Sequence, residues 1–81
     1  MTARVRLVDE AVVELEDAAR WYEEQRAGLG FGFVAAVDRT IDRMAHWPFS
    51  GSLIDGVDEV LQVRRLPVKR FPNYVAYLFG A

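Results

Sequence analysis

The 81-residue chain contains no cysteine and only one histidine. Without cysteine, neither disulfides nor thiolate chemistry is available, which argues against a small secreted domain held together by disulfides. His46 has no other ligand at metal-binding spacing, so we predict no metal site and no cofactor. The longest apolar run, 74–79, is far shorter than the roughly 20 residues that span a bilayer, and the N-terminal residues lack the apolar core of a signal peptide. We therefore expect a cytoplasmic protein that does not contact membranes.

Acidic residues are absent from the C-terminal part of the chain. Residues 1–63 contain all twelve acidic residues and six arginines, a net charge of −6, whereas residues 64–81 contain four basic residues and no acid, a net charge of +4. The basic residues are Arg64, Arg65, Lys69 and Arg70. Because complementary charge steers association, this polarity points to an acidic or polyanionic partner at the basic end.

The length and composition predict one folded domain over residues 1–81. The hydrophobic content of 52% is ample for a core, and 81 residues leave no room for a second one. Alternating apolar and arginine residues predict a strand over 3–8. Apolar residues at helical spacing predict a first helix over 9–27 with Asp9 as its N-cap, ended by Gly28-Leu29-Gly30. They also predict a second helix over 31–45 that ends before Pro48.

The remainder of the chain predicts a loop and a β-hairpin. Residues 48–58 contain turn-forming residues and are expected to form the loop. Residues 59–66 and 74–79 are rich in β-branched and aromatic residues, which is typical of paired strands. Pro67 cannot donate a backbone hydrogen bond, so it should lie on an outer edge or at a bulge. The predicted order is β-α-α-β-β, an α+β fold with a two-helix hairpin packed on a small antiparallel sheet.

Few residues carry recognisable chemistry. Ser50 and Ser52 have no base at a recognisable spacing, and the glycines of 28–32 join two helices rather than following a strand, so neither a nucleophile nor a phosphate loop is predicted. Trp21 lies beside the apolar stripe of the first helix, where it either packs at the edge of the core or anchors a protein partner.

The basic cluster is the most informative feature. Arg64 and Arg65 should point to opposite faces of a strand, while Lys69 and Arg70 lie in the connection that leads to Tyr74 and Tyr77. One interpretation is a cationic patch whose aromatic neighbours stack bases and whose cations hold phosphates. The other is that these cations pair with carboxylates of the helices.

Several sequence blocks occur together in an order and spacing that resemble the RelE/ParE superfamily of bacterial type II toxins, most closely its ParE-like branch. The blocks are Trp21-Tyr22-Glu23-Glu24-Gln25, Gly28-Leu29-Gly30, Val63-Arg64-Arg65, Arg70-Phe71-Pro72 and Tyr74-Val75-Ala76-Tyr77. The resemblance covers nearly the whole chain. It implies a toxin that is neutralised by a cognate antitoxin, forming a hetero-oligomer.

The resemblance leaves three functions open. ParE-like members bind DNA gyrase, which implies a toxin that acts by binding, without catalytic residues and without sequence-specific DNA contacts. RelE-like members cut mRNA in the ribosome, and that alternative would use Arg64, Arg65, Lys69 and Arg70. A truncated toxin that only binds antitoxin is the third. The residues expected to contact antitoxin or target are Trp21, Arg64, Arg65, Lys69, Arg70, Tyr74 and Tyr77.

The chain departs from the family near its C-terminal end. Family members usually continue past the block Tyr74–Tyr77 with another strand, which is missing here. The expectation is that 74–79 presents an unpaired apolar edge, to be covered by an antitoxin strand or a second copy of the chain. Asn73 also stands where the family often has an aromatic residue, which predicts a shifted register at that turn.

Overall fold

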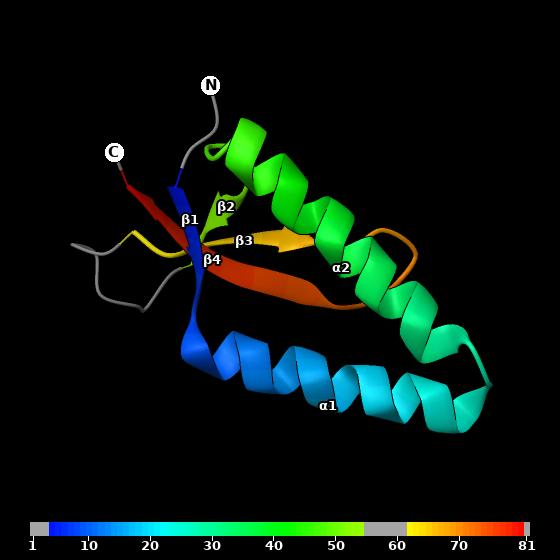
Figure 1. The fold of residues 1–81 in the computed structure, drawn as a ribbon. Helices are drawn as coiled ribbons and strands as arrows, with labels where there is room; N and C mark the ends of the chain where they lie inside the picture. Colours follow the sequence, from blue (N-terminus) through cyan, green and yellow to red (C-terminus); the bar gives the residue numbers. More distant parts are fainter. Residues whose placement is uncertain (1–3, 55–61, 81) are drawn as a thin grey trace.

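A computed structural model describes residues 4–54 and 62–80, and it contains two helices and four strands (Figure 1). Strand β1 (Arg4–Leu7) is followed by helices α1 (Asp9–Gln25) and α2 (Leu29–His46). Strands β2 (Ser52–Leu53), β3 (Arg64–Pro67) and β4 (Tyr74–Gly80) complete the chain order β-α-α-β-β-β. The predicted α+β fold, a helical hairpin on a small antiparallel sheet, is confirmed, with β2 as an additional strand.

The strands form one antiparallel sheet in the order β1-β4-β3-β2. Strand β4 lies inside the sheet, because β1 pairs with one of its sides, with Leu7 opposite Tyr77, and β3 pairs with the other. The prediction that 74–79 forms an unpaired edge is therefore wrong. The N-terminal strand returns to pair with β4, and that long-range pairing leaves no local signal in the sequence.

The prediction that Pro67 lies at an outer edge is confirmed by the pairing of strand β3. Pro67 pairs with Tyr74 of β4, whereas β2 reaches only Arg64 and Arg65 on the other side of β3. No strand of the described residues pairs with the outer side of Pro67, so its missing N–H group costs no ladder hydrogen bond.

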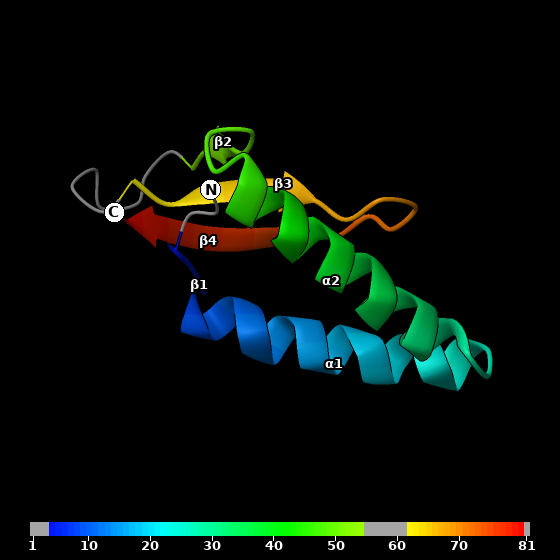
Figure 2. The same cartoon turned by 45° about the horizontal axis from the view of Figure 1, so that its top comes forward.

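Both helices cover the same face of the sheet, and α2 crosses the strands obliquely (Figures 1 and 2). Successive residues of a strand point to opposite faces, so Val5 and Leu7 of β1 and Val75 and Tyr77 of β4 face the helices. The core between helices and sheet contains Phe33, Ala36, Val37, Met44, Leu66, Val68, Val75 and Tyr77. Among the described helices, none is long and apolar enough to cross a membrane.

The connection between the helices lies earlier in the chain than the sequence predicted, because α1 ends at Gln25 rather than at residue 27. Gly28 has a φ of 89°, a left-handed conformation that glycine adopts readily, and it is the last of the three residues, 26–28, that separate α1 from α2. The Glu23 carboxylate accepts hydrogen bonds from the backbone N–H groups of Gly28 and Gly30, at 2.9 and 3.0 Å. These bonds satisfy two free donors at the start of α2, so the helix begins at Leu29 rather than at residue 31. Gly30 becomes a buried helical residue.

Other boundaries also differ from the predictions. Helix α1 has Val8 as its N-cap, and Asp9 is its first helical residue, so the predicted Asp9 cap is wrong. Its charge still suits the positive end of the helix dipole. The predicted strand over 59–66 begins only at Arg64, and residues 59–61 lie outside the described residues. Strand β2 lies within the predicted loop of 48–58, of which residues 55–58 also lie outside that description.

Candidate functional site

The predicted basic cluster is divided between the two faces of the sheet. Arg64 lies opposite Tyr77 and points to the helix side, whereas Arg65 lies opposite Ala76 and points to the side that neither helix covers. The prediction that these neighbouring arginines serve different surfaces is consistent with this register. The two side chains therefore make different contacts, one on each face of the sheet.

Arg64 and Tyr77 hold the segment that follows α2. The Arg64 guanidinium donates to the Gly51 carbonyl at 2.7 Å and lies 5.1 Å from the centre of the Phe49 ring. The Tyr77 hydroxyl donates to the Pro48 carbonyl at 2.7 Å and accepts from the Gly51 N–H at 3.1 Å. Tyr77 is fully buried, so its position does not fit the predicted role in contacting a partner.

The uncovered side of the sheet carries three arginines around a mostly apolar centre, and we call it the open face. The register places Arg6 beside Leu78, Arg65 beside Ala76 and Pro67 beside Tyr74 on this side, with Arg4 further along β1. Arg4, Arg6, Arg65 and Tyr74 are exposed, while Ala76 and Leu78 are half-buried. Arg6 and Arg65 lie on either side of β4 and are offset by two residues along it, so their backbones are about 12 Å apart.

Arg65 and Tyr74 contact each other on the open face. The Arg65 guanidinium lies over the Tyr74 ring, 4.7 Å from its centre, which is the geometry of a cation–π contact. The contact orients the guanidinium and leaves its N–H groups directed at solvent, where they can bind a carboxylate or phosphate in a fork. The predicted combination of Arg65 with Tyr74 is therefore brought together in space.

Carboxylates do not neutralise the open face within the described part of the chain. The two ion pairs there are Arg20–Asp17 and His46–Asp42, both on helices. Across residues 4–54 and 62–80, moreover, no three His, Asp or Glu side chains are grouped as a metal site would require. The open face thus has the chemistry to bind anions, and Tyr74 adds a hydroxyl-bearing aromatic group to it.

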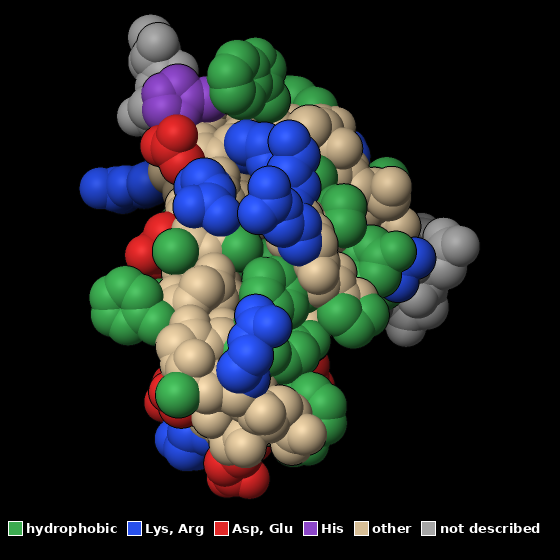
Figure 3. Space-filling model, turned by 90° about the vertical axis from the view of Figure 1, so that its right-hand side faces the viewer, with side chains coloured by type: hydrophobic (Ala, Val, Ile, Leu, Met, Phe, Trp, Pro, Cys, Tyr) green, Lys and Arg blue, Asp and Glu red, His purple; other side chains and the backbone are tan. Residues whose placement is uncertain are grey.

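Lys69 and Arg70 lie away from the open face, in the turn between β3 and β4. Arg70 has a φ of 73°, a left-handed backbone conformation, within this turn. Lys69 lies beside Arg39 and Arg43 of α2, two arginines that the sequence analysis did not single out. Figure 3 views the molecule from the side of this turn and shows several Lys and Arg side chains gathered there, with acidic side chains at the margin.

Trp21 lies on the outer side of α1. It is 56% exposed and packs edge-on against Tyr22, with ring centres 5.3 Å apart. Tyr22 in turn contacts Phe33 and Phe71 and donates to the Asn73 side chain at 2.6 Å, which joins α1 to the β3–β4 turn. Trp21 is therefore both anchored at its base and accessible at its surface, so it remains a candidate protein contact.

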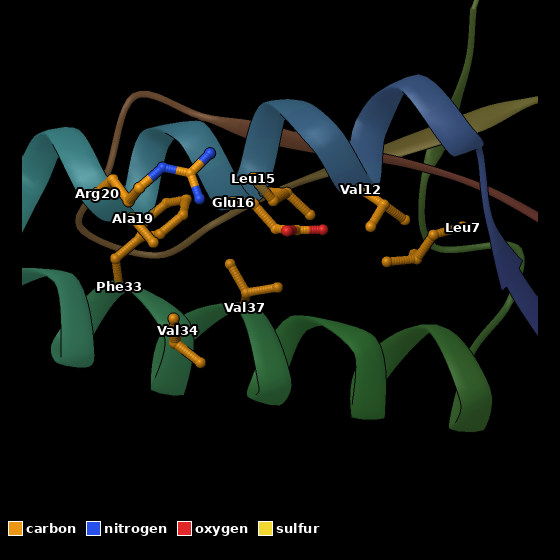
Figure 4. Close-up of a pocket in the computed structure, with 9 residues that line it drawn as sticks. All are labelled: Leu7, Val12, Leu15, Glu16, Ala19, Arg20, Phe33, Val34 and Val37. Atoms are coloured by element: carbon orange, nitrogen blue, oxygen red, sulfur yellow. The ribbon is translucent and has the colours of Figure 1, made fainter.

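The sequence analysis missed an apolar groove between the helices. It has a volume of about 340 Å³ and runs between α1 and α2, with Leu7 of β1 at one end (Figure 4). Its lining consists of Leu7, Val12, Leu15, Glu16, Ala19, Arg20, Phe33, Val34 and Val37. Val12 is 37% and Val34 47% exposed, so part of the apolar stripe of each helix faces solvent. Each stripe looked like core in the sequence, and only the splay of the helices opens the groove.

Comparisons with known proteins found no match to the chain among family models, curated proteins or solved structures. The functional assignment therefore rests on the residues themselves.

Proposed function

We propose that this protein is the toxin of a bacterial type II toxin–antitoxin pair, that it is ParE-like, and that it acts in the cytoplasm by binding DNA gyrase. The observation that carries this proposal is the open face, where Arg4, Arg6 and Arg65 surround Tyr74, Ala76 and Leu78. Arginine and tyrosine around a small apolar centre are typical of protein-binding surfaces. The cognate antitoxin would neutralise the toxin by covering such surfaces.

The groove between α1 and α2 supports the antitoxin part of the proposal. It offers apolar contacts along two helices, and Glu16 and Arg20 supply one charge of each sign among its lining residues. An amphipathic segment can place its apolar residues against Val12, Leu15 and Val34 in the way that helix-in-groove complexes do. Trp21 is not among the residues that line the groove, so a partner contact through Trp21 would be separate from it.

The separation of the cluster makes the endonuclease alternative weaker. Phosphodiester cleavage needs its cations and proton-transfer groups around one phosphate. Arg64 is engaged with Gly51 on the helix side, Arg65 lies on the open face, and Lys69 lies beside α2. These three residues do not converge on one position, so binding accounts for the arrangement better than catalysis.

Expression without antitoxin tests the proposal. The induced protein should arrest bacterial growth, and the purified protein should inhibit supercoiling by gyrase. The double variant R6Q/R65Q should inhibit gyrase roughly tenfold or more weakly, because a hydrogen bond to a charged group contributes about 1.5–3 kcal/mol. The matched variant R20Q/R26Q, which removes the same charge near α1, should keep its inhibition, and circular dichroism should show both variants folded.

Other results would select among the alternatives. Arrest with mRNA cut in the ribosomal A site would contradict gyrase binding and favour the endonuclease. Uninterrupted growth on expression of the wild-type protein would leave only the inactive form that binds antitoxin.

A further inference from the structure

A second cationic site lies on α2, apart from the open face. Arg39 and Arg43 are four residues apart, so they project from the same side of the helix with Cβ atoms about 5–6 Å apart. Lys69 of the β3–β4 turn faces them across a hollow of about 260 Å³. Three cations from two elements that are distant in sequence therefore surround one depression.

The site is held in place by the contact between the turn and the helix. Arg43 donates from Nη2 to the Pro67 carbonyl at 3.1 Å, which ties the end of β3 to α2 and orients the guanidinium. That bond uses one of the five N–H donors of Arg43 and leaves the others for a ligand. Thr40 lies in the lining of the hollow, fully buried, and its hydroxyl already donates to the Ala36 carbonyl at 2.9 Å. Binding must therefore come from the cations.

Among the described residues, Asp42 is the one carboxylate that lines the hollow. Its side chain is 74% exposed, and one oxygen lies 3.6 Å from Nδ1 of His46. Within residues 4–54 and 62–80, neither Arg39, Arg43 nor Lys69 forms an ion pair with Asp42 or any other acid. The lining carries three positive charges against one negative charge, an excess that attracts anions.

We infer that Arg39, Arg43 and Lys69 bind phosphate groups of a nucleic-acid backbone. Arginine forks match phosphate oxygens, and the described part of the lining contains no aromatic side chain on which a base could stack. Within residues 4–54 and 62–80, Ala36 is the only apolar residue that lines the hollow. Protein interfaces have an apolar centre, so this lining favours a nucleic acid over an acidic protein segment. Contacts of this kind position a strand without reading its sequence. The inference does not depend on the proposed function.

The salt dependence of nucleic-acid binding tests this inference. Fluorescence anisotropy with short labelled RNA strands, DNA strands and DNA duplexes of mixed sequence should show binding to the wild-type protein that weakens with salt. In R39Q/K69Q, which retains the Arg43–Pro67 bond, affinity should fall on the order of tenfold at about 0.2 M salt. The slope of log K against log salt should shrink by about 1.4 for single strands and about 1.8 for the duplex. The three probes distinguish RNA from DNA as the source of the phosphates.

The matched control R20Q/R26Q removes the same charge elsewhere and should leave the slope within a few tenths of wild type. Amide shifts on adding RNA should centre on residues 36–43 and 67–70. An equal loss in both double variants, or shifts confined to the open face around Arg6 and Arg65, would overturn the inference. Polyglutamate that binds more tightly than any nucleic-acid probe would overturn it as well and assign the site to an acidic protein segment. Both variants change exposed side chains, and circular dichroism should show that they fold.

Discussion

The two faces of the sheet are made by the same strands and differ in almost every property. On the covered face, Leu66, Val75 and Tyr77 are buried against the helices. Their immediate neighbours Arg65 and Tyr74 are exposed on the open face. The alternation of a strand thus lets consecutive residues serve either stability or recognition. The comparison predicts that neighbouring substitutions have unequal effects on unfolding.

The largest difference should separate Leu66 from Arg65. Replacing Leu66 with alanine removes a buried side chain that contacts the core cluster, so the free energy of unfolding should fall by about 2–5 kcal/mol. Arg65→Ala, one residue away, should change it by less than about 0.5 kcal/mol. Denaturant unfolding followed by circular dichroism measures both. Equal losses would mean that the open face also contributes to the core.

A second comparison concerns how closely the helices approach above the covered face. A Cβ atom on Gly30 would lie 2.4 Å from the Ala19 carbonyl oxygen of α1, so Gly30→Ala should force the helices apart and lower the free energy of unfolding by about 1–3 kcal/mol. A Cβ on Gly32 would meet nothing within 4 Å. Gly32→Ala should raise stability by about 0.5–1 kcal/mol, because alanine is the better helix former. Thermal unfolding of the two variants should give shifts of opposite sign.

The smallest expected difference in unfolding free energy is between Tyr77 and Tyr74, which lie on opposite faces of β4. Tyr77→Phe removes the hydroxyl that bonds to Pro48 and Gly51, and the unpaired backbone groups should cost about 1–2 kcal/mol of unfolding free energy. Tyr74→Phe retains the ring under Arg65 and should change stability by less than about 0.5 kcal/mol. If Tyr77→Phe left the unfolding midpoint unchanged, water would be replacing the hydroxyl and the segment 48–51 would not depend on it.

The fold was predictable where the signal is local. Apolar spacing gave both helices and three strands, because burial of one face dictates the period of the sequence. Helix ends were shifted, since the chain reverses over residues 26–28, where Gly28 is left-handed, and Glu23 supplies hydrogen bonds to the start of α2 from within α1. The two-residue β2 was missed because it exists only through its pairing with β3.

The candidate sites were predictable only in part. The sequence contained one usable signal that the prediction of Tyr77 overlooked: Tyr74 and Tyr77 are three residues apart, so a strand places them on opposite faces. Arg39 and Arg43 had a signal too, since they stand four apart on the polar side of a predicted helix. Their meeting with Lys69 could not be read from spacing, because it depends on how the β3–β4 turn packs on α2.

The central position of β4 also sets an order for folding during synthesis. The helical hairpin needs only contacts between neighbouring elements and can form early, whereas β1 has no partner until β4 leaves the ribosome. Pairings between residues far apart in the chain form slowly, and an unpaired strand is exposed to wrong partners while it waits. Translation therefore includes an interval in which β1 and the apolar face of the hairpin are available to chaperones or to other chains.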